Sequence, residues 1–288
     1  MADTVNVKPT GATLGADIEG VNLAQAIDDA AFETIQEAWR DHLVLRFRRQ
    51  ALDDNALAAF SARFGALDMA PISTTGKPFN PDRPEIAIIS NIVEAGKAKG
   101  GLGNSELVWH QDMSYKDLPP MASLLYGVET PKAGGETFFY NLYAAYEALP
   151  RDLKARIGGL SCKHDATRNS SGQLRHGFDA EYAHADRPGA IHPLAIRHPV
   201  SGRTALYLGR RPNAWIVGFS DADSAALLDA LWAHIEGNDF SWATEWRPGD
   251  LVIWDNRCTL HRRNQLDPAM RRLMRRTQVK DTARPVAA

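Results

Sequence analysis

The chain has 288 residues, of which 44% are hydrophobic, so it can bury a sizeable core in one domain or two small ones. Its 33 Lys and Arg residues against 35 Asp and Glu residues give a formal net charge of -2, which provides no overall attraction to nucleic acid or to an anionic membrane. Because no apolar run has the length of a secretory signal or a membrane span, and two cysteines are too few for a disulfide framework, we expect a cytoplasmic protein.

The first part of the chain predicts short strands and two helices. Residues 5–23 are rich in glycine and β-branched residues, which favours short strands with turns. Residues 30–42 have apolar residues at helical spacing after a capping aspartate, Asp28 or Asp29, and residues 53–64 predict a second helix that ends before Gly65. The apolar run 43–47 between them predicts a buried strand.

A third apolar strand is predicted over residues 86–90, between two segments with loop composition. Residues 72–84 contain Gly76 and three prolines, and residues 94–104 are rich in glycine and lysine. Long loops in compact domains are often functional, so we expect both segments to act as lids over a site.

The second half of the chain is predicted to alternate strands with a few helices. Strands are expected near residues 122–127, 136–140, 204–208, 251–255 and 271–279, and helices over residues 142–149, 152–159 and 220–236. The polar stretch 160–190 is a third expected lid.

Short strands separated by turns, with helices early in the chain and as insertions, favour a mainly β protein with flanking helices, an α+β sandwich or jelly roll. We find no internal repeat and no linker, which favours a single domain over residues 1–288.

The segment Trp109-His110-Gln111-Asp112 carries the clearest chemical signal. If this segment is a strand, His110 and Asp112 project from the same face, because side chains alternate with period two. His261 follows the apolar strand 251–255 and would add a second imidazole. Two histidines and one carboxylate on one face of a metal form the arrangement of non-haem Fe(II) oxygenases. The other seven histidines lack this context, and we interpret them as surface or packing residues.

Two interpretations fit the run Arg271-Arg272-Leu273-Met274-Arg275-Arg276. It is either a charged surface in solvent or a strand whose arginines are divided between an inner and an outer face. Strand alternation places Arg272 and Arg276 on one face and Arg271 and Arg275 on the other. An arginine directed into a barrel needs a carboxylate partner, which its planar fork binds well. Thr137, after the Gly134-Gly135 turn, is predicted to add a hydroxyl to the same anion site.

These motifs together resemble the taurine dioxygenase and 2,4-dichlorophenoxyacetate dioxygenase family of Fe(II)/2-oxoglutarate-dependent oxygenases. The resemblance begins with the Gly-Ala-x-Ile-x-Gly-Val pattern at 15–21 and extends to the arginine strand. Its most specific parts are Trp-His-x-Asp at 109–112, Gly-Gly-Glu-Thr at 134–137 and Trp-Asp-Asn-Arg at 254–257. The resemblance implies a double-stranded β-helix with the metal site inside one end of the barrel.

The same resemblance implies roles for individual residues. His110, Asp112 and His261 would be the catalytic iron ligands, and Arg272 with Thr137 would bind the distal carboxylate of 2-oxoglutarate. Arg276 would hold the anionic group of the substrate or the inner carboxylate of the co-substrate. Related halogenases lack the carboxylate ligand, so the presence of Asp112 implies hydroxylation.

The substrate region departs from the taurine enzymes. Ala70 stands where they have a sulfonate-binding histidine, and Glu106 where they have an amine-contacting asparagine. Aryloxyalkanoate and other organic-acid enzymes are therefore the expected relatives. The residues that flank the ligand segment and its neighbouring strand are the candidates for the substrate wall, namely Asn91, Glu106, Met113 and Tyr115.

The resulting prediction is a dioxygenase that uses Fe(II), 2-oxoglutarate and O2 to hydroxylate a small anionic organic molecule, a carboxylate such as an aryloxyalkanoate or a sulfonate, producing succinate and CO2. Hydroxylation beside a heteroatom would also cleave a C–O or C–S bond. No nucleic acid or membrane partner is expected, and the resemblance suggests a homodimer or homotetramer.

Three other classes remain open at this point. A zinc-dependent hydrolase uses the same two-His-one-carboxylate site but leaves Thr137, Arg272 and Arg276 without a role. An oxygenase that modifies nucleic acid or protein would share the barrel, although the slightly acidic charge disfavours nucleic acid. The last alternative is a metal-binding barrel without enzymatic activity.

Overall fold

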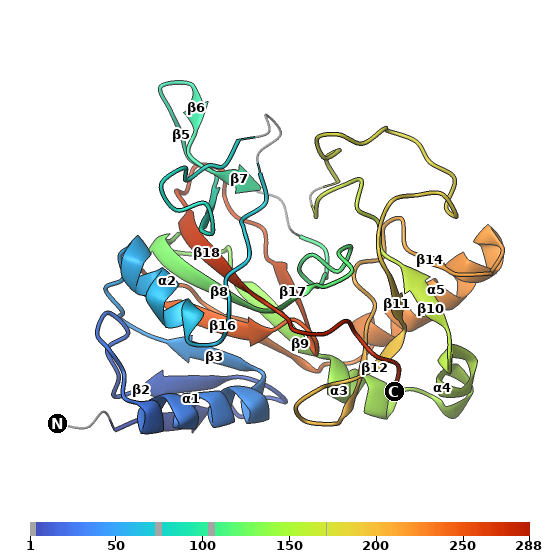
Figure 1. Ribbon diagram of the computed structural model, residues 1–288, viewed down its shortest axis with the longest axis horizontal. Helices are drawn as coiled ribbons and strands as arrows, with labels where there is room; N and C mark the ends of the chain where they lie inside the picture. Colours follow the sequence, from blue (N-terminus) through green and yellow to red (C-terminus); the bar gives the residue numbers. More distant parts are fainter. Residues whose placement is uncertain (1–3, 73–76, 103–106, 171) are drawn as a thin grey trace.

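The computed structural model describes residues 4–72, 77–102, 107–170 and 172–288, without the side chain of Leu102. The largest sheet in these residues has eight strands in the order β1-β2-β3-β16-β8-β18-β4-β7 (Figure 1). Its strands are β1 (Asn6–Pro9), β2 (Ala16–Glu19), β3 (Val44–Phe47), β16 (Leu251–Asp255), β8 (Pro120–Glu129), β18 (Leu273–Lys280), β4 (Ala87–Ser90) and β7 (Gly101–Leu102). Most neighbours are antiparallel, but β2 pairs with β3 and β4 with β7 in parallel.

A second sheet, β15-β9-β17, is formed by β15 (Ser241–Thr244), β9 (Thr137–Asn141) and β17 (Thr259–Arg263). The remaining strands form small sheets: β11 (Ile191–Pro193), β10 (Ser161–Lys163) and β14 (Trp215–Ile216); β12 (Ala195–Arg197) and β13 (Thr204–Leu206); and β5 (Val93–Glu94) with β6 (Lys97–Ala98). The expectation of a mainly β protein with few helices is confirmed.

The helices begin where the sequence places capping side chains. Asp28 caps α1 (Asp29–His42), Asp53 caps α2 (Asp54–Ala62), and Ser220 caps α5 (Asp221–Glu236), each accepting a hydrogen bond from a backbone N–H three residues on. The two short helices are α3 (Leu142–Ala148) and α4 (Arg151–Ile157). Among the described residues, no helix has the length and apolar character needed to cross a lipid bilayer.

The eight-stranded sheet separates two cores because its side chains alternate between its faces. On one face Leu124 and Ile253 pack with Ile35 and Phe60 of α1 and α2. On the other face Leu125, Trp254 and Met274 join Phe139 and Leu260 of the second sheet, together with α3 and α5. The interior face of β16, β8 and β18 is therefore the one directed at β9 and β17.

The arginine strand follows this alternation. Arg272 and Arg276 are buried, at 2% and 5% exposure, on the same face as Met274. Arg275 is on the opposite face and forms an ion pair with Asp54 of α2, while Arg271 is exposed and pairs with Glu129 and Glu94. The split-face interpretation of the run is thus correct, and the solvated-surface interpretation is wrong for Arg272 and Arg276.

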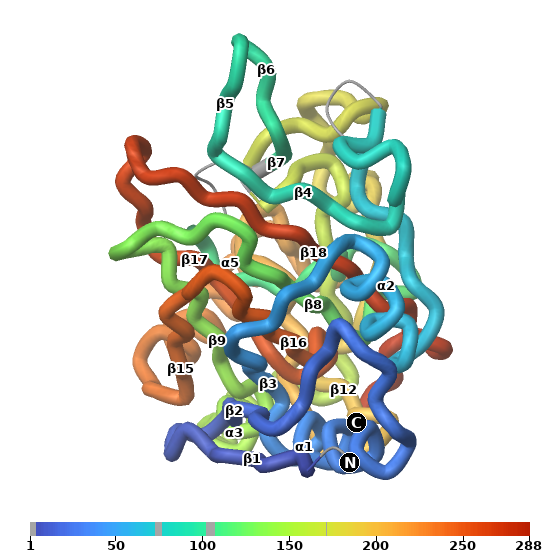
Figure 2. Tube along the Cα trace, turned by 90° about the vertical axis from the view of Figure 1, so that its left-hand side faces the viewer, coloured from blue at the N-terminus to red at the C-terminus, as the bar shows by residue number. Residues whose placement is uncertain are grey.

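Two segments differ from their expected form. Residues 109–112 do not form a strand: His110 makes a single β-bridge to His261, and a turn follows at 112–115 with Met113 at a φ of 49°. Residues 93–102 are not a plain loop but contain the β5–β6 hairpin and β7, and the hairpin projects from one end of the molecule (Figure 2). The irregular segment after β10, residues 164–190, lies at the same end in both views.

Candidate active site

The three residues proposed as metal ligands meet where the ligand segment joins β17. His110 and His261 exchange backbone hydrogen bonds of 3.0 and 2.9 Å, which holds their rings beside each other with centroids 4.2 Å apart. The chain then turns at Met113, so that the Asp112 carboxylate faces both rings. One ligand atom from each of the three residues lies within 4.8 Å of the others, and all three side chains are buried.

The orientation of the imidazoles suits metal binding. Nδ1 of His110 donates to the carbonyl of Val108 at 2.9 Å, a hydrogen bond that selects the tautomer with the lone pair on Nε2. The Nε2 atoms of His110 and His261 lie 4.0 and 3.8 Å from Oδ1 of Asp112. Two metal–ligand bonds of about 2.1 Å span up to about 4.2 Å, so one ion fits between these atoms. Burial and then the neighbouring His110 lower the pKa of His261 well below its ordinary value, which keeps this ring neutral.

The carboxylate is held in place by a buried polar network. Oδ2 of Asp112 accepts from the hydroxyl of Ser123 at 2.7 Å, and that hydroxyl accepts from the amides of Asn256 and Gln278. Asn256 is fixed in turn by the indole N–H of Trp254. Burial alone would raise the pKa of Asp112, but the positive charge of Arg276, with the hydrogen bond from Ser123, outweighs it and lowers this pKa, so the group is ionised.

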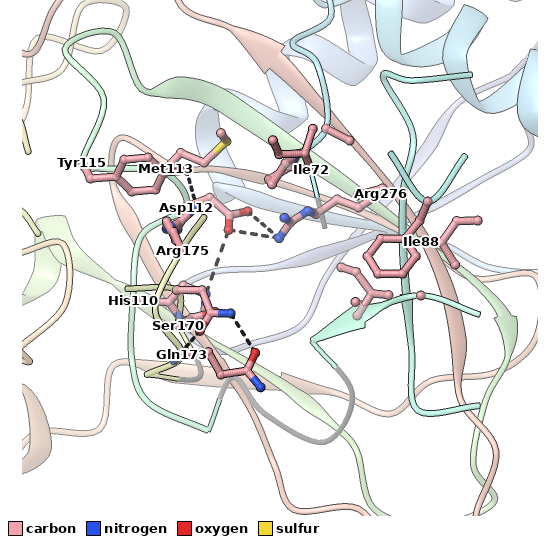
Figure 3. Close-up of a pocket in the computed structure, with 18 of the residues that line it drawn as sticks. Ile72, Ile88, His110, Asp112, Met113, Tyr115, Ser170, Gln173, Arg175 and Arg276 are labelled. Atoms are coloured by element: carbon pink, nitrogen blue, oxygen red, sulfur yellow. Dashed lines mark hydrogen bonds and ion pairs between the residues drawn. The ribbon is translucent and has the colours of Figure 1, made fainter. Parts of the chain in front are cut away.

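Arg276 connects this site to a second, narrower cavity. Its Nη1 lies 3.1 and 3.3 Å from the two oxygens of Asp112 (Figure 3). The narrow cavity is lined by Thr137, Arg263, Arg272 and Arg276, together with His261 and Trp254. The Thr137 hydroxyl is oriented by the indole N–H of Trp246 at 2.9 Å. Several cationic groups around a small buried space form a site for a carboxylate.

On the other side of Asp112 lies a cavity of about 1180 Å³, a volume that suits a small organic substrate. Figure 3 shows Tyr115, Met113 and Arg175 on one side of Asp112 and Ile72, Ile88 and Arg276 on the other. All three expected lids contribute to its lining, with Phe79, Ala98 and Leu174 as examples.

The predicted substrate residues fall in different places. Met113 and Tyr115 line the large cavity. Asn91 lines it too, but its amide donates to the carbonyl of Met270 and accepts from the N–H of Arg272, so it supports the backbone before the arginine strand. Glu106 lies outside the described residues.

Several residues of the two cavities were not identified from the sequence, and Arg263, Arg175 and His164 are examples. Arg263 is two positions after His261 on β17 and opposite Thr137, so strand alternation was a usable signal. Arg175 and His164 line the large cavity from the irregular segment after β10. No periodic pattern in that part of the sequence indicates which side chains face the cavity. His164 is buried against His192 and Tyr207, as expected of a packing residue, and it also lines the cavity.

A second buried cluster, His198, Asp255 and Cys258, also has the composition of a metal site. Here, however, Asp255 accepts two hydrogen bonds from the guanidinium of Arg257 and one from its backbone N–H, and it lies 3.1 Å from Nε2 of His198. Nδ1 of His198 accepts from the backbone N–H of Ser201, so neither imidazole nitrogen is directed at an open site. We therefore interpret this cluster as structural.

The sequence is similar to a known family of dioxygenases. The profile of the family described as "Taurine catabolism dioxygenase TauD, TfdA family" matches residues 6–278. The α-ketoglutarate-dependent 2,4-dichlorophenoxyacetate dioxygenase of Cupriavidus pinatubonensis is 34% identical and is aligned over 97% of this chain and 99% of its own length. Pentalenolactone F synthase of Streptomyces avermitilis is 33% identical over 96% and 94% of the two chains.

Solved structures agree with these matches. The crystal structure of a putative α-ketoglutarate-dependent taurine dioxygenase from Burkholderia xenovorans superposes with a TM-score of 0.80 at 31% identity, covering 99% of this chain and 92% of that one. The crystal structure of AAD-2 in complex with Mn(II) and N-oxalylglycine gives a TM-score of 0.78 at 28% identity, covering 98% and 100%.

Proposed function

The chain belongs to the TauD/TfdA dioxygenase family, and from this premise we propose that His110, Asp112 and His261 bind its ferrous iron. It is an Fe(II)- and 2-oxoglutarate-dependent dioxygenase, an oxidoreductase. The observation that carries the assignment of the ligands is the convergence of two imidazole Nε2 atoms on one ionised, buried carboxylate. This donor set suits ferrous iron and leaves the opposite face for other ligands.

We further propose that the narrow cavity receives the distal carboxylate end of 2-oxoglutarate. Arg272 and Thr137 would bind its distal carboxylate, and Arg276 its inner carboxylate or the anionic group of the substrate. The support is the position of Arg276, which lines both cavities and contacts Asp112. Arg263, opposite Thr137, adds a further cation to this carboxylate site.

The bound iron, with 2-oxoglutarate and O2, supplies the oxidation that forms succinate and CO2 and hydroxylates the substrate. The protein's own residues orient and enclose the reactants. Ser123 and Asn256 fix the carboxylate of Asp112, the carbonyl of Val108 fixes the tautomer of His110, and Ile72 and Ile88 provide an apolar wall for the substrate.

For the substrate we propose a small anionic organic molecule, a carboxylate such as an aryloxyalkanoate, a sulfonate or a sulfate ester. The similarity to the 2,4-dichlorophenoxyacetate enzyme and to the α-ketoglutarate-dependent sulfate ester dioxygenase of Pseudomonas putida, 32% identical, supports an acid of this kind. Hydroxylation next to the ether or ester oxygen would cleave the C–O bond and release an alcohol or phenol.

We also propose that the eight-stranded sheet and the sheet β15-β9-β17 are the two halves of a double-stranded β-helix in a single domain. Their inward-facing side chains share one core, and the His110–His261 bridge lies at one end of it. Nothing in the comparisons supports a zinc-dependent hydrolase.

The function is tested by succinate release with Fe(II), 2-oxoglutarate and O2 over a panel of aryloxyalkanoates, sulfonates and alkyl sulfates. We expect at least one acid to stimulate succinate formation, and Asp112→Ala to abolish substrate hydroxylation. A wild-type protein that forms no succinate with any acid, or an Asp112→Ala variant with full turnover, contradicts the proposal. Asp239→Ala, at an exposed site on the loop before β15, is the matched control and is expected to retain activity.

A further inference from the structure

Arg175 places a guanidinium in the wall of the large cavity from a segment outside the strands, whereas Arg276 belongs to β18. Arg175 lies on the segment 164–190, is half-buried, and is on the same side of Asp112 as Tyr115 (Figure 3). The apolar wall with Ile72 and Ile88 is on the other side. The cavity therefore has one wall with Arg175 and Tyr115 and an opposite, mainly apolar wall, where the charge of Arg276 is paired with Asp112.

Tyr115 and the backbone hold Arg175 in one orientation. The guanidinium stacks on the Tyr115 ring, 4.1 Å from its centroid, and Nη1 donates to the phenolic oxygen at 2.7 Å. Nε donates to the carbonyl of Arg168 at 3.2 Å, and the backbone N–H of Arg175 donates to the carbonyl of Thr167. A side chain fixed in this way loses little further conformational entropy when a ligand binds.

The segment that carries Arg175 is tied to the ligand segment by Arg210. Arg210 pairs with the buried carboxylate of Asp165 at 3.1 Å and donates to the carbonyls of Arg168 and Asn169. The residue before it, Gly209, exchanges hydrogen bonds with Gln111, between the two ligands His110 and Asp112. Arg210 is thus a positioning residue that fixes Arg175 relative to the metal site.

The charge of Arg175 is not compensated by a carboxylate. Arg276 and Arg210 form ion pairs with Asp112 and Asp165, whereas no Asp or Glu among the described residues forms an ion pair with Arg175. Two of its five N–H groups are used, which leaves three for an anion.

Tyr115 supplies a further donor at the same place. Its oxygen accepts from Arg175, so its own O–H proton can donate into the cavity. Burial raises the pKa of Tyr115 against the opposing charge of Arg175, so the phenol stays protonated at neutral pH.

The opposite wall and rim suit an apolar body. Large apolar residues that line the cavity are left exposed, among them Met69, Ile72, Val93 and Leu107, at 62%, 57%, 63% and 42%. Phe79 and Ile88 continue this surface inward. Exposed apolar side chains gathered at one cavity indicate a ligand that covers them.

We propose that Arg175 and Tyr115 form a second anion-recognition site, which binds the acid group of the primary substrate while its apolar body lies along the Ile72–Ile88 wall. The substrate class is an amphipathic carboxylate or sulfate ester. This inference rests on the proposed function, because it concerns the primary substrate of the same active site.

The test measures binding without turnover, by calorimetry on protein loaded with Mn(II) and N-oxalylglycine. One series pairs 2,4-dichlorophenoxyacetate with its uncharged methyl ester, and the other pairs octyl sulfate with octanol. The variants are Arg175→Gln, which removes the charge, and Arg175→Lys, which keeps it. Arg211→Gln is the control, because Arg211 is half-buried outside the cavity lining and pairs with the exposed Asp229.

We expect the wild-type protein to bind at least one acid more tightly than its neutral partner. Arg175→Gln should raise the Kd for that acid by about 10- to 100-fold. In this variant the affinity for the neutral partner, the affinity for 2-oxoglutarate and the rate of uncoupled succinate release should stay within about twofold of the wild-type values. Arg175→Lys should recover part of the loss, and Arg211→Gln should match the wild type.

Three results overturn the inference. In the first, Arg175→Gln binds the acid as tightly as the wild type. In the second, Arg175→Gln loses 2-oxoglutarate affinity to the same extent, which indicates a structural role. In the third, the wild-type protein distinguishes no acid from its neutral partner. The failure of the proposed function looks different, because the wild-type protein would then form no succinate from 2-oxoglutarate.

Discussion

Replacing Arg272 by alanine should weaken 2-oxoglutarate binding more than any other single change in the narrow cavity. Arg272 is 2% exposed and lies with Thr137 and Arg263 around that cavity, so a carboxylate bound there would be desolvated. Truncating one partner of a buried charge pair costs about 2–5 kcal/mol, which corresponds to roughly a 30- to 4,000-fold increase in Kd. Thr137→Val removes a neutral donor and should cost only about 0.5–1.5 kcal/mol, or about 2- to 12-fold.

The assay is calorimetric titration of 2-oxoglutarate into Mn(II)-loaded protein, with thermal denaturation to confirm folding. Arg271→Ala is the matched control, because this neighbouring arginine is exposed and pairs with Glu129 and Glu94 outside the cavity. An Arg272→Ala protein that is folded and binds 2-oxoglutarate like Arg271→Ala would refute the assignment.

Three further outcomes are expected. Arg276→Ala should reduce substrate-stimulated succinate release by at least about tenfold, because a buried partner of Asp112 is lost; equal losses in stimulated and uncoupled release would place Arg276 at the co-substrate alone. Gly209→Ala should lower the free energy of unfolding by about 2–4 kcal/mol, because a Cβ there would lie 2.0 Å from Nδ1 of His164 at a φ of +62°. Gly202→Ala, with a φ of +69° and open space, is its control in urea unfolding, and equal effects would contradict the steric explanation. Burial lowers the pKa of His164 to about 3, so the unfolded chain binds a proton that the folded chain does not as pH falls from about 6.5 towards 3, and stability should fall with it. His164→Asn should flatten this pH dependence by up to about 1.4 kcal/mol per pH unit, and an unchanged slope in urea unfolding between pH 7 and 5 would exclude that contribution.

Features that depend on local chemistry could be predicted from the sequence. The caps Asp28, Asp53 and Ser220 act on N–H groups three residues away, so the starts of their helices are encoded locally. The two faces of the arginine strand follow from period-two alternation, which places Arg272 and Arg276 inside.

The form of the ligand segment could not be predicted in the same way. His110 and Asp112 converge through one bridge to β17 and a turn with Met113 at positive φ, a conformation that the residue types do not favour. The extended interpretation brought the three proposed ligands together, as the structure does, but for the wrong local reason. A strained backbone next to a functional carboxylate is retained only where surrounding contacts hold it, here through Gln111 and Gly209.

The wall residues needed tertiary information. Arg175 reaches the cavity because Arg210 and Asp165 fix an irregular segment, and these three positions are separated by many residues in the chain. No periodic pattern marks such contacts. Arg263 differs, since its spacing from His261 was sufficient to place it on the ligand face of β17.

The most direct test of the central claim is the anomalous difference map of a crystal grown with Mn(II). We predict one metal peak within about 2.2 Å of Nε2 of His110, a carboxylate oxygen of Asp112 and Nε2 of His261. A metal bound at His198, Asp255 and Cys258 instead, with no peak between His110 and His261, would contradict the assignment of the active site.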